Sequence, residues 1–296
     1  MRKFILHIVI FFIVVLGTIV YILSLADGYS DSFYLKVSSP KKTNLILGTS
    51  KAAQGVHPDI LKNILNKDFY NYAFTFYASP YGEVYLNSIK QKIDKKEKNS
   101  IFILTIDAWS ICSSNEDPDN TLKFRENKSF LNNITDVSHK PNYKYLINYF
   151  EGEYYKILFK SKSSVFIHDD GWLEVSLDEN GVKRRTEFTM KDYQKKVNYY
   201  HFSNTRLFYL LETIDYLNQY GKVYLVRLPA CNDLMVLEET LMPNFNETIQ
   251  PVKDKASGYL DLTLLKKDLN YTDGVHLNKA SGKYVSEIIA KWIKDL

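Results

Sequence analysis

Cysteine is scarce in this 296-residue chain, and the two that occur, Cys112 and Cys231, are too few for a disulfide scaffold. No spacing in the sequence resembles a zinc or haem site, so we expect neither a metal nor a cofactor. The chain also lacks a block of basic residues, because 38 Lys and Arg stand against 34 Asp and Glu, a formal charge of +4. Nucleic acid is therefore not an implied partner.

One long apolar run is present at the amino terminus. Residues 4–26 are almost wholly apolar, with His7 as the only ionisable side chain, which is enough to span a bilayer. Two basic residues precede the run, and the positive-inside rule then places everything after it outside the cytoplasm. A cleaved signal peptide is the alternative, because residues 24–26 (Ser-Leu-Ala) offer small side chains, although such apolar regions normally run only about 7 to 15 residues. Both interpretations export the domain.

The rest of the chain suits one α/β domain with an insertion. Residues 27–42 are polar and are expected to form a stalk, and the domain proper is expected over residues 43–296. Apolar runs and helical periodicity alternate, which is typical of a three-layer α/β/α parallel sheet of the flavodoxin-like kind. Strands are expected at 44–47, 69–73, 101–106, 223–226 and 259–262, and helices at 58–65, 80–93, between the N-cap Ser203 and the stop Gly221, and at 280–293.

The regular pattern is interrupted between about residues 113 and 199, where the sequence becomes polar and aromatic. The pattern predicts a hairpin strand from Trp172 to Leu177, a turn at Asn180-Gly181 and a return strand. This connection leaves from the carboxyl edge of the expected sheet. We therefore expect the aromatic hairpin, with Trp172, to cover the site and form part of a cleft for an extended acceptor; the other interpretation is a peripheral decoration that only adds stability.

The two cysteines each lie a few residues beyond an expected core strand. If those strands are neighbours, the thiols approach each other on the same side of the sheet, and an exported compartment would permit a bridge. Both a disulfide and two free thiols are open on the sequence alone.

Ser50 follows the apolar run Leu45-Ile46-Leu47 and Gly48, at the carboxyl end of a strand, where open α/β sheets build their sites. A serine in such a turn is also a common helix cap. The small Ala52 and Ala53 permit a tight bend, and a helix beginning here would aim its amides at the same space. The backbone amide of Lys51 is then a candidate oxyanion donor.

Near the carboxyl terminus, His276 stands three residues after Asp273. A serine hydroxyl is a poor nucleophile without a base, and the base needs a third group that orients it and stabilises the imidazolium. Asp273 can accept from one imidazole nitrogen while the other faces Ser50. The structural alternative is that Asp273 caps the last helix and His276 only packs there.

The residues 48–50 (Gly-Thr-Ser), together with 273–278 (Asp-Gly-Val-His-Leu-Asn), resemble the first and last sequence blocks of the SGNH hydrolases, also called GDSL esterases and lipases. The likeness covers about 43–110 and 203–293. It is closer to membrane-anchored SGNH-like proteins that act in O-acylation of bacterial cell-surface polymers. The resemblance implies Ser50 as nucleophile, His276 as general base and Asp273 as its orienting carboxylate, and it raises a membrane partner in polysaccharide acylation.

The sequence departs from the SGNH pattern at the oxyanion hole. Family members usually have Asp where Thr49 stands, and the Gly of the second block and Asn of the third have no clean counterpart around residues 71–75 and 107–110. Asn71 and Thr75 are the candidate oxyanion donors, together with the amide of Lys51. Arg227 and Trp109, which follow expected strands, are two further candidates, for binding the substrate.

Arg227 could hold an anionic substrate group or form a salt bridge with a nearby carboxylate. Trp109 could form the base of a sugar-binding pocket or pack in the core.

Together these features predict an extracytoplasmic serine esterase or O-acyltransferase acting on acyl esters of a carbohydrate or cell-surface polymer. The alternative from a different class is a non-catalytic, membrane-anchored glycan-binding or scaffold protein with a decayed site. The triad serves hydrolysis and transfer equally, so the sequence does not choose between them.

Overall fold

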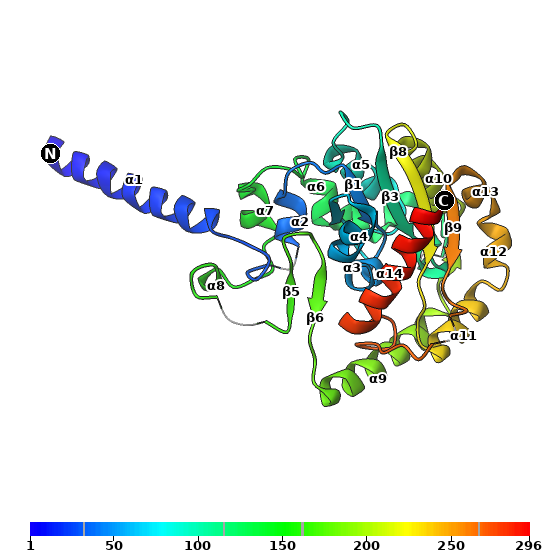
Figure 1. Cartoon of the computed structure of the whole chain (residues 1–296). Coiled ribbons are helices and arrows are strands. Elements are labelled where there is room, and N and C mark those ends of the chain that lie inside the picture. Colours follow the sequence, from blue (N-terminus) through cyan, green and yellow to red (C-terminus); the bar gives the residue numbers. More distant parts are fainter. Residues whose placement is uncertain (32, 115, 161–162, 266) are drawn as a thin grey trace.

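The computed structural model describes residues 1–31, 33–114, 116–160, 163–265 and 267–296. Its centre is a five-stranded sheet in the order β2-β1-β3-β8-β9, in which every neighbouring pair is parallel (Figure 1). The strands are β1 (Asn44–Leu47), β2 (Phe69–Asn71), β3 (Ser100–Thr105), β8 (Gly221–Arg227) and β9 (Gly258–Asp261). All five were predicted from the sequence, and β2 ends two residues earlier than expected.

The middles of the central strands are apolar because helices cover both faces of the sheet. Side chains alternate between two cores: Leu45 and Leu47 belong to one hydrophobic cluster, and Ile46 between them belongs to the other. On the first face lie α5 (Glu83–Lys92), α10 (Asn204–Leu217) and α13 (Gln250–Lys255), and on the second lie α3 (Ser50–Gly55), α4 (Pro58–Leu65) and α14 (Lys279–Asp295). The three-layer α/β fold class is confirmed.

The helix boundaries follow local capping chemistry. Ser203 accepts a hydrogen bond from the amide of Arg206 and caps α10, as its position before the apolar periodicity predicted. Pro58 opens α4, where a missing amide costs nothing. Two further helices, α11 (Asn232–Leu241) and α12 (Phe245–Thr248), follow β8 at the edge of the sheet where the site lies.

The predicted stalk is folded into the domain. Within residues 27–42 the chain forms α2 (Tyr34–Ser38), and all five residues of this helix are buried. Tyr34 and Val37 join the same hydrophobic cluster as Leu45 of β1. The polar composition of this segment predicted a stalk outside the domain. Its apolar side chains, however, bury enough surface to hold the segment against the sheet.

The inserted region contains many short elements. They are η1 (Ala108–Ile111), β4 (Cys112–Ser113), η2 (Thr121–Lys123), η3 (Arg125–Lys128), α6 (Phe130–Asn133), α7 (Tyr143–Asn148), α8 (Tyr155–Leu158), β5 (Val165–Ile167), β6 (Leu173–Val175), α9 (Glu179–Lys196) and β7 (His201–Phe202). Phe130, Tyr145 and Leu146 are buried in the same cluster as the sheet. The insertion is therefore part of one core with the sheet, which contradicts its interpretation as a peripheral decoration.

The strand predicted within 172–177 is present as β6, but the predicted hairpin is wrong, because the partner of this strand precedes it and no return strand follows it. Strands β5 and β6 pair antiparallel, and the chain reverses between them, before Leu173 rather than at Asn180-Gly181. Residues 179–196 form the helix α9, whose N-cap Asp178 accepts a hydrogen bond from the amide of Gly181 at 2.7 Å. Asn-Gly favours a hairpin turn only where strands flank it, and here the Asp178 cap selects a helix instead.

Candidate active site

Ser50 stands at a tight turn between β1 and α3. Gly48 has a φ of +133°, and a Cβ built on it would lie 2.1 Å from the Thr105 Oγ1, so only glycine fits this approach of β1 to β3. Thr49 is the N-cap of α3 and Ser50 its first helical residue. The turn thus fixes the Ser50 side chain at the carboxyl end of the sheet.

The loop before α14 orients the other two side chains. The Asp273 Oδ1 accepts hydrogen bonds from the amides of Val275 and His276, and Gly274 between them adopts a positive φ of +84°. A backbone hydrogen bond from the Thr272 amide to the His276 carbonyl closes the loop at 2.8 Å. These contacts bring the Asp273 carboxylate to the ring of the histidine three residues later.

Ser50, His276 and Asp273, brought together from both ends of the domain, form a hydrogen-bonded chain. The His276 Nε2 lies 2.7 Å from the Ser50 Oγ, and its Nδ1 lies 2.7 Å from the Asp273 Oδ2. With a proton on Nδ1 shared with the carboxylate, Nε2 is free to accept the proton of the serine hydroxyl. The geometry is therefore that of a nucleophile, a base and an orienting acid.

The charge of Asp273 suits this arrangement. Its side chain is 11% exposed, and burial raises the pKa of its carboxyl. The charge and hydrogen bonds of His276 and the two loop amides outweigh burial, so the net pKa lies below the ordinary value. Asp273 is consequently ionised at neutral pH and can stabilise an imidazolium.

A buried ionic network, not anticipated from the sequence, lies next to Ser50. The Lys51 Nζ is 2.5 Å from the Glu238 Oε1 and 3.1 Å from the Asp107 Oδ2, and all three side chains are less than 9% exposed. Burial lowers the pKa of Lys51, but the two carboxylates outweigh it and the pKa is raised above its ordinary value. The network ties the start of α3 to the ends of β3 and α11. Lys51 and Asp107 each follow an expected strand, but no sequence pattern pairs either of them with Glu238.

Arg227 extends the same network. Its guanidinium lies 3.4 Å from Glu238 and 3.6 Å from Asp261, and it stacks 4.4 Å over the Phe245 ring. Of the two predicted roles, the salt bridge is the one observed.

Trp109 is 1% exposed and packs edge-on against Tyr193 at 4.7 Å between ring centroids. Its ring therefore belongs to the core in this structure.

The three oxyanion candidates occupy different surroundings. The Asn71 Nδ2 donates to the carbonyls of Ala52 and Val56 at 2.9 and 3.0 Å, so both amide hydrogens are committed to the backbone around α3. Thr75 lines a hollow of about 550 Å³ that contains no triad residue. The amide of Lys51 lies in the first turn of α3, where no carbonyl four residues earlier is available within the helix. Of the three, Lys51 is the one whose position fits a donor beside Ser50.

The helix α9 lies across the loop that carries Asp273 and His276. A Cβ built on Gly274 would meet Cys231 at 3.2 Å, Thr186 at 3.5 Å and Met190 at 3.7 Å, the last two from α9. The insertion therefore reaches the carboxyl edge, as expected, but through a helix rather than through the hairpin.

Trp172 was expected to line a cleft, and it is buried instead. Its Nε1 donates to the Gln54 carbonyl at 2.8 Å, and its ring packs on His57 at 4.1 Å between centroids. The hairpin is thus fastened to α3 and α4 through this side chain.

In the described part of the chain both cysteines are free thiols, with Cys112 buried and the Cys231 Sγ 3.9 Å from the Met190 Sδ. The described residues also hold no group of three or more His, Cys, Asp or Glu placed to bind a metal ion.

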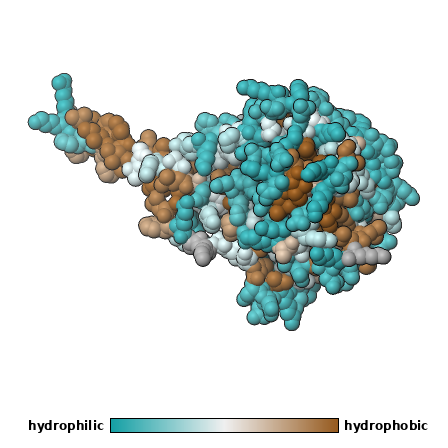
Figure 2. All heavy atoms as spheres, viewed as in Figure 1, coloured by the Kyte–Doolittle hydropathy of each residue, from teal (hydrophilic) through white to brown (hydrophobic). Residues whose placement is uncertain are grey.

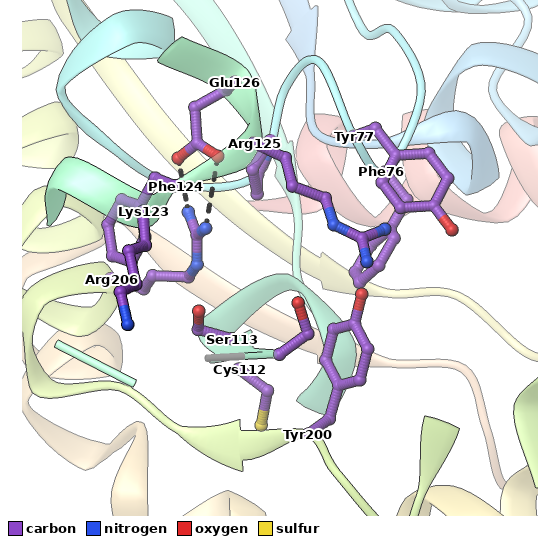
Figure 3. Close-up of a pocket in the computed structure, with 12 residues that line it drawn as sticks. Phe76, Tyr77, Cys112, Ser113, Lys123, Phe124, Arg125, Glu126, Tyr200 and Arg206 are labelled. Carbon is purple, nitrogen blue, oxygen red and sulfur yellow. Dashed lines mark hydrogen bonds and ion pairs between the residues drawn. The ribbon is translucent and has the colours of Figure 1, made fainter. Parts of the chain in front are cut away.

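A second hollow lies beside the turn that follows β2. It is walled by Phe76, Tyr77 and Tyr200, with Arg125 directed across the opening (Figure 3). Its back is closed by the paired side chains of Glu126 and Arg206, joined by hydrogen bonds of 2.8 and 3.2 Å. No triad residue lines it.

Comparisons with known proteins give distant structural neighbours. No family model and no curated protein matches the chain. Among solved structures, the chain is similar to a carbohydrate esterase family 2 enzyme with a carbohydrate-binding domain from Corynascus thermopiles (Myceliophthora fergusii), at 12% identity and a TM-score of 0.36, covering 87% of this chain and 67% of that one. It is also similar to the acetyl xylan esterase Est2A of the rumen bacterium Butyrivibrio proteoclasticus, at 11% identity and a TM-score of 0.29. This second alignment covers 88% of the present chain and 64% of the esterase.

Proposed function

We propose that the protein is a serine-dependent acyl-ester enzyme, a hydrolase or an O-acyltransferase, whose nucleophile is Ser50. The observation that carries the proposal is the distance of 2.7 Å on each side of the His276 ring, to the Ser50 Oγ and to the Asp273 Oδ2. A non-catalytic protein with a decayed site has no need to keep a serine, a histidine and a carboxylate in this register. The motifs around residues 48–50 and 273–278 support the same interpretation through their resemblance to SGNH hydrolases.

In the proposed reaction, His276 removes the Ser50 proton as the Oγ attacks the ester carbonyl carbon. The tetrahedral oxyanion would receive a hydrogen bond from the Lys51 amide. His276 then gives its proton to the leaving alkoxide, and an acyl-serine forms. Water or a sugar hydroxyl, deprotonated by the same histidine, attacks the acyl group and restores Ser50.

The substrate class is proposed to be an acyl ester on a carbohydrate or cell-surface polymer, reached outside the cytoplasm. Support comes from the sequence resemblance to membrane-anchored SGNH-like proteins and from α1 (Arg2–Ser24), which is long and apolar enough to cross a membrane or to serve as a signal sequence. A membrane protein that supplies acyl groups would be the partner in a transfer reaction.

The proposal is tested by kinetics with the full chain in detergent and a small synthetic acetyl ester. Wild type should release acetate, and Ser50→Ala should lower kcat by about 10⁶-fold or to the background rate. Adding an acetylated oligosaccharide and a second unacetylated acceptor separates the two reactions, because a transferase moves the label to the acceptor and a hydrolase releases it. Wild-type turnover equal to that of Ser50→Ala would contradict the proposal.

A further inference from the structure

The amino-terminal helix enters the domain without a spacer. No residue of α1 is buried, yet Ile22 and Leu23 in its last turn pack against the main hydrophobic cluster, and Ala26 is 1% exposed within it. The Asp27 Oδ1 then accepts hydrogen bonds from the amides of Tyr29 and Ser30, which fixes the first turn after the helix. A domain joined this tightly to a membrane helix must lie at the bilayer surface.

Exposed apolar side chains gather beside this junction. Figure 2 shows hydrophobic atoms next to the inner end of α1, where α8 lies against it in Figure 1. We call these side chains the α8 patch: Ile147, Tyr154, Tyr155, Leu158 and Phe159, with exposed fractions of 66, 50, 58, 46 and 72%. Single exposed apolar residues are ordinary, but five on two short helices, α7 and α8, which the hydrogen bond from the Tyr154 hydroxyl to the Leu146 carbonyl joins, indicate a contact surface.

The chemistry of the α8 patch fits a lipid surface. Tyrosine and phenylalanine prefer the region between headgroups and acyl chains, where the ring is apolar and a hydroxyl can reach water. Two cations of the described residues beside the patch are neutralised, because Lys156 pairs with Glu153 at 2.7 Å and Lys160 pairs with Asp27. Binding would therefore depend on apolar insertion more than on attraction to anionic lipids.

We propose that the α8 patch inserts into the outer leaflet of the bilayer that α1 spans, so that the domain lies on the membrane and is held at two places. The occupant is the lipid surface because the anchoring helix, against which α8 lies, delivers this patch to the membrane. The inference rests on the proposed membrane anchoring of the chain, but not on its esterase activity. Docking would hold Ser50 at a fixed distance from the bilayer surface. This position would suit ester groups that lie close to the membrane.

The test uses the full chain with both native cysteines replaced (Cys112→Ala, Cys231→Ala) and one new cysteine at the position of Phe159 or of Phe188. Phe188 on α9 is the matched control, a phenylalanine with 74% exposure against 72% for Phe159. Each variant is spin-labelled and placed one chain per nanodisc, in phosphatidylcholine alone and with added phosphatidylglycerol. Collisions of the label with oxygen, which enters lipid, and with a water-soluble nickel complex are then measured.

With Phe159→Cys, collisions with the nickel complex should be at least about threefold rarer than with Phe188→Cys, and collisions with oxygen more frequent, as expected for a side chain at the headgroup boundary. Anionic lipid should change the result little. One chain per disc excludes shielding by a second copy. Equal nickel accessibility at the two positions would overturn the docking, and failure of the chain to co-purify with nanodiscs would overturn the anchor. Serine labelling on the same sample reports the proposed activity separately.

Discussion

The sheet and the insertion are built by different means, although they share one core. The three central strands of the sheet, β1, β3 and β8, are four to seven residues long, and most of their residues are buried. The insertion has short elements, several of four residues or fewer, held by aromatic contacts such as Phe130 on Tyr145 at 5.5 Å and by single polar side chains. The difference teaches that the regular half places Ser50, Asp273 and His276, whereas the irregular half packs against the loop that carries the last two residues. The predictions below test that division.

The largest effect is expected at the triad carboxylate in the regular half. Asp273→Asn keeps the shape of the loop but removes the charge that orients His276, and should lower kcat by about 10⁴-fold. The matched change in the insertion is Asp136→Asn, whose carboxylate is 66% exposed and lies 3.9 Å from the exposed ring of His139, and it should leave kcat within a factor of about two because surface ion pairs contribute little. Comparable losses in both variants would contradict the division of roles.

The buried network should be the next most sensitive feature. Lys51→Met leaves the buried carboxylate of Asp107 without its cation and leaves Glu238 with Arg227 alone, and should lower the free energy of unfolding by about 3–5 kcal/mol. Lys279→Met removes a cation of similar length from Glu174 of the insertion, but this lysine is 51% exposed, and the loss should stay below about 1 kcal/mol. Denaturant titration of both variants measures the contrast.

Trp172 tests whether the insertion and the sheet unfold together. Trp172→Ala removes a buried ring and its hydrogen bond to Gln54, and should cost about 3 kcal/mol. Phe188→Ala, exposed on α9, should change stability by less than about 0.5 kcal/mol. Because the two regions share a core, both variants should unfold in one transition by fluorescence and circular dichroism. Two separated transitions would show that the insertion is an independent unit.

A pH dependence of stability is expected at the same boundary. Burial lowers the pKa of His57 to about 4, whereas an unfolded histidine titrates near 6.5. Between these values the unfolded chain binds a proton that the folded chain does not, so the free energy of unfolding should fall as the pH drops from 6.5 to 4. His57→Gln should flatten the slope in this window. An unchanged slope would show that a group other than His57 causes the loss of stability at acidic pH.

Sequence periodicity was sufficient for the regular half and insufficient for the insertion. The strand at 44–47 and the helix at 58–65 match the structure because apolar periodicity and Pro58 are local signals. Residues 179–196 were misread because Asn180-Gly181 is a turn signal that only tertiary packing and the Asp178 cap could override. The partnership of Lys51 with Glu238 joins residues 187 apart in the chain, and no local pattern reports it. Asn71 was predicted to be an oxyanion donor from its position in the second sequence block. Its side chain instead donates to carbonyls of α3 and of the residue that ends it, and the sequence does not show where this helix ends.

The central claim is that Ser50 is the acylated residue, and covalent labelling tests it most directly. The purified full chain is treated with a serine-directed fluorophosphonate, digested, and the adduct located by mass spectrometry in wild type, in Ser50→Ala and in Ser257→Ala, an exposed serine that serves as control. The account predicts one adduct, on the peptide that contains Ser50, present in wild type and Ser257→Ala and lost in Ser50→Ala. Labelling that persists at the same level in Ser50→Ala would contradict it.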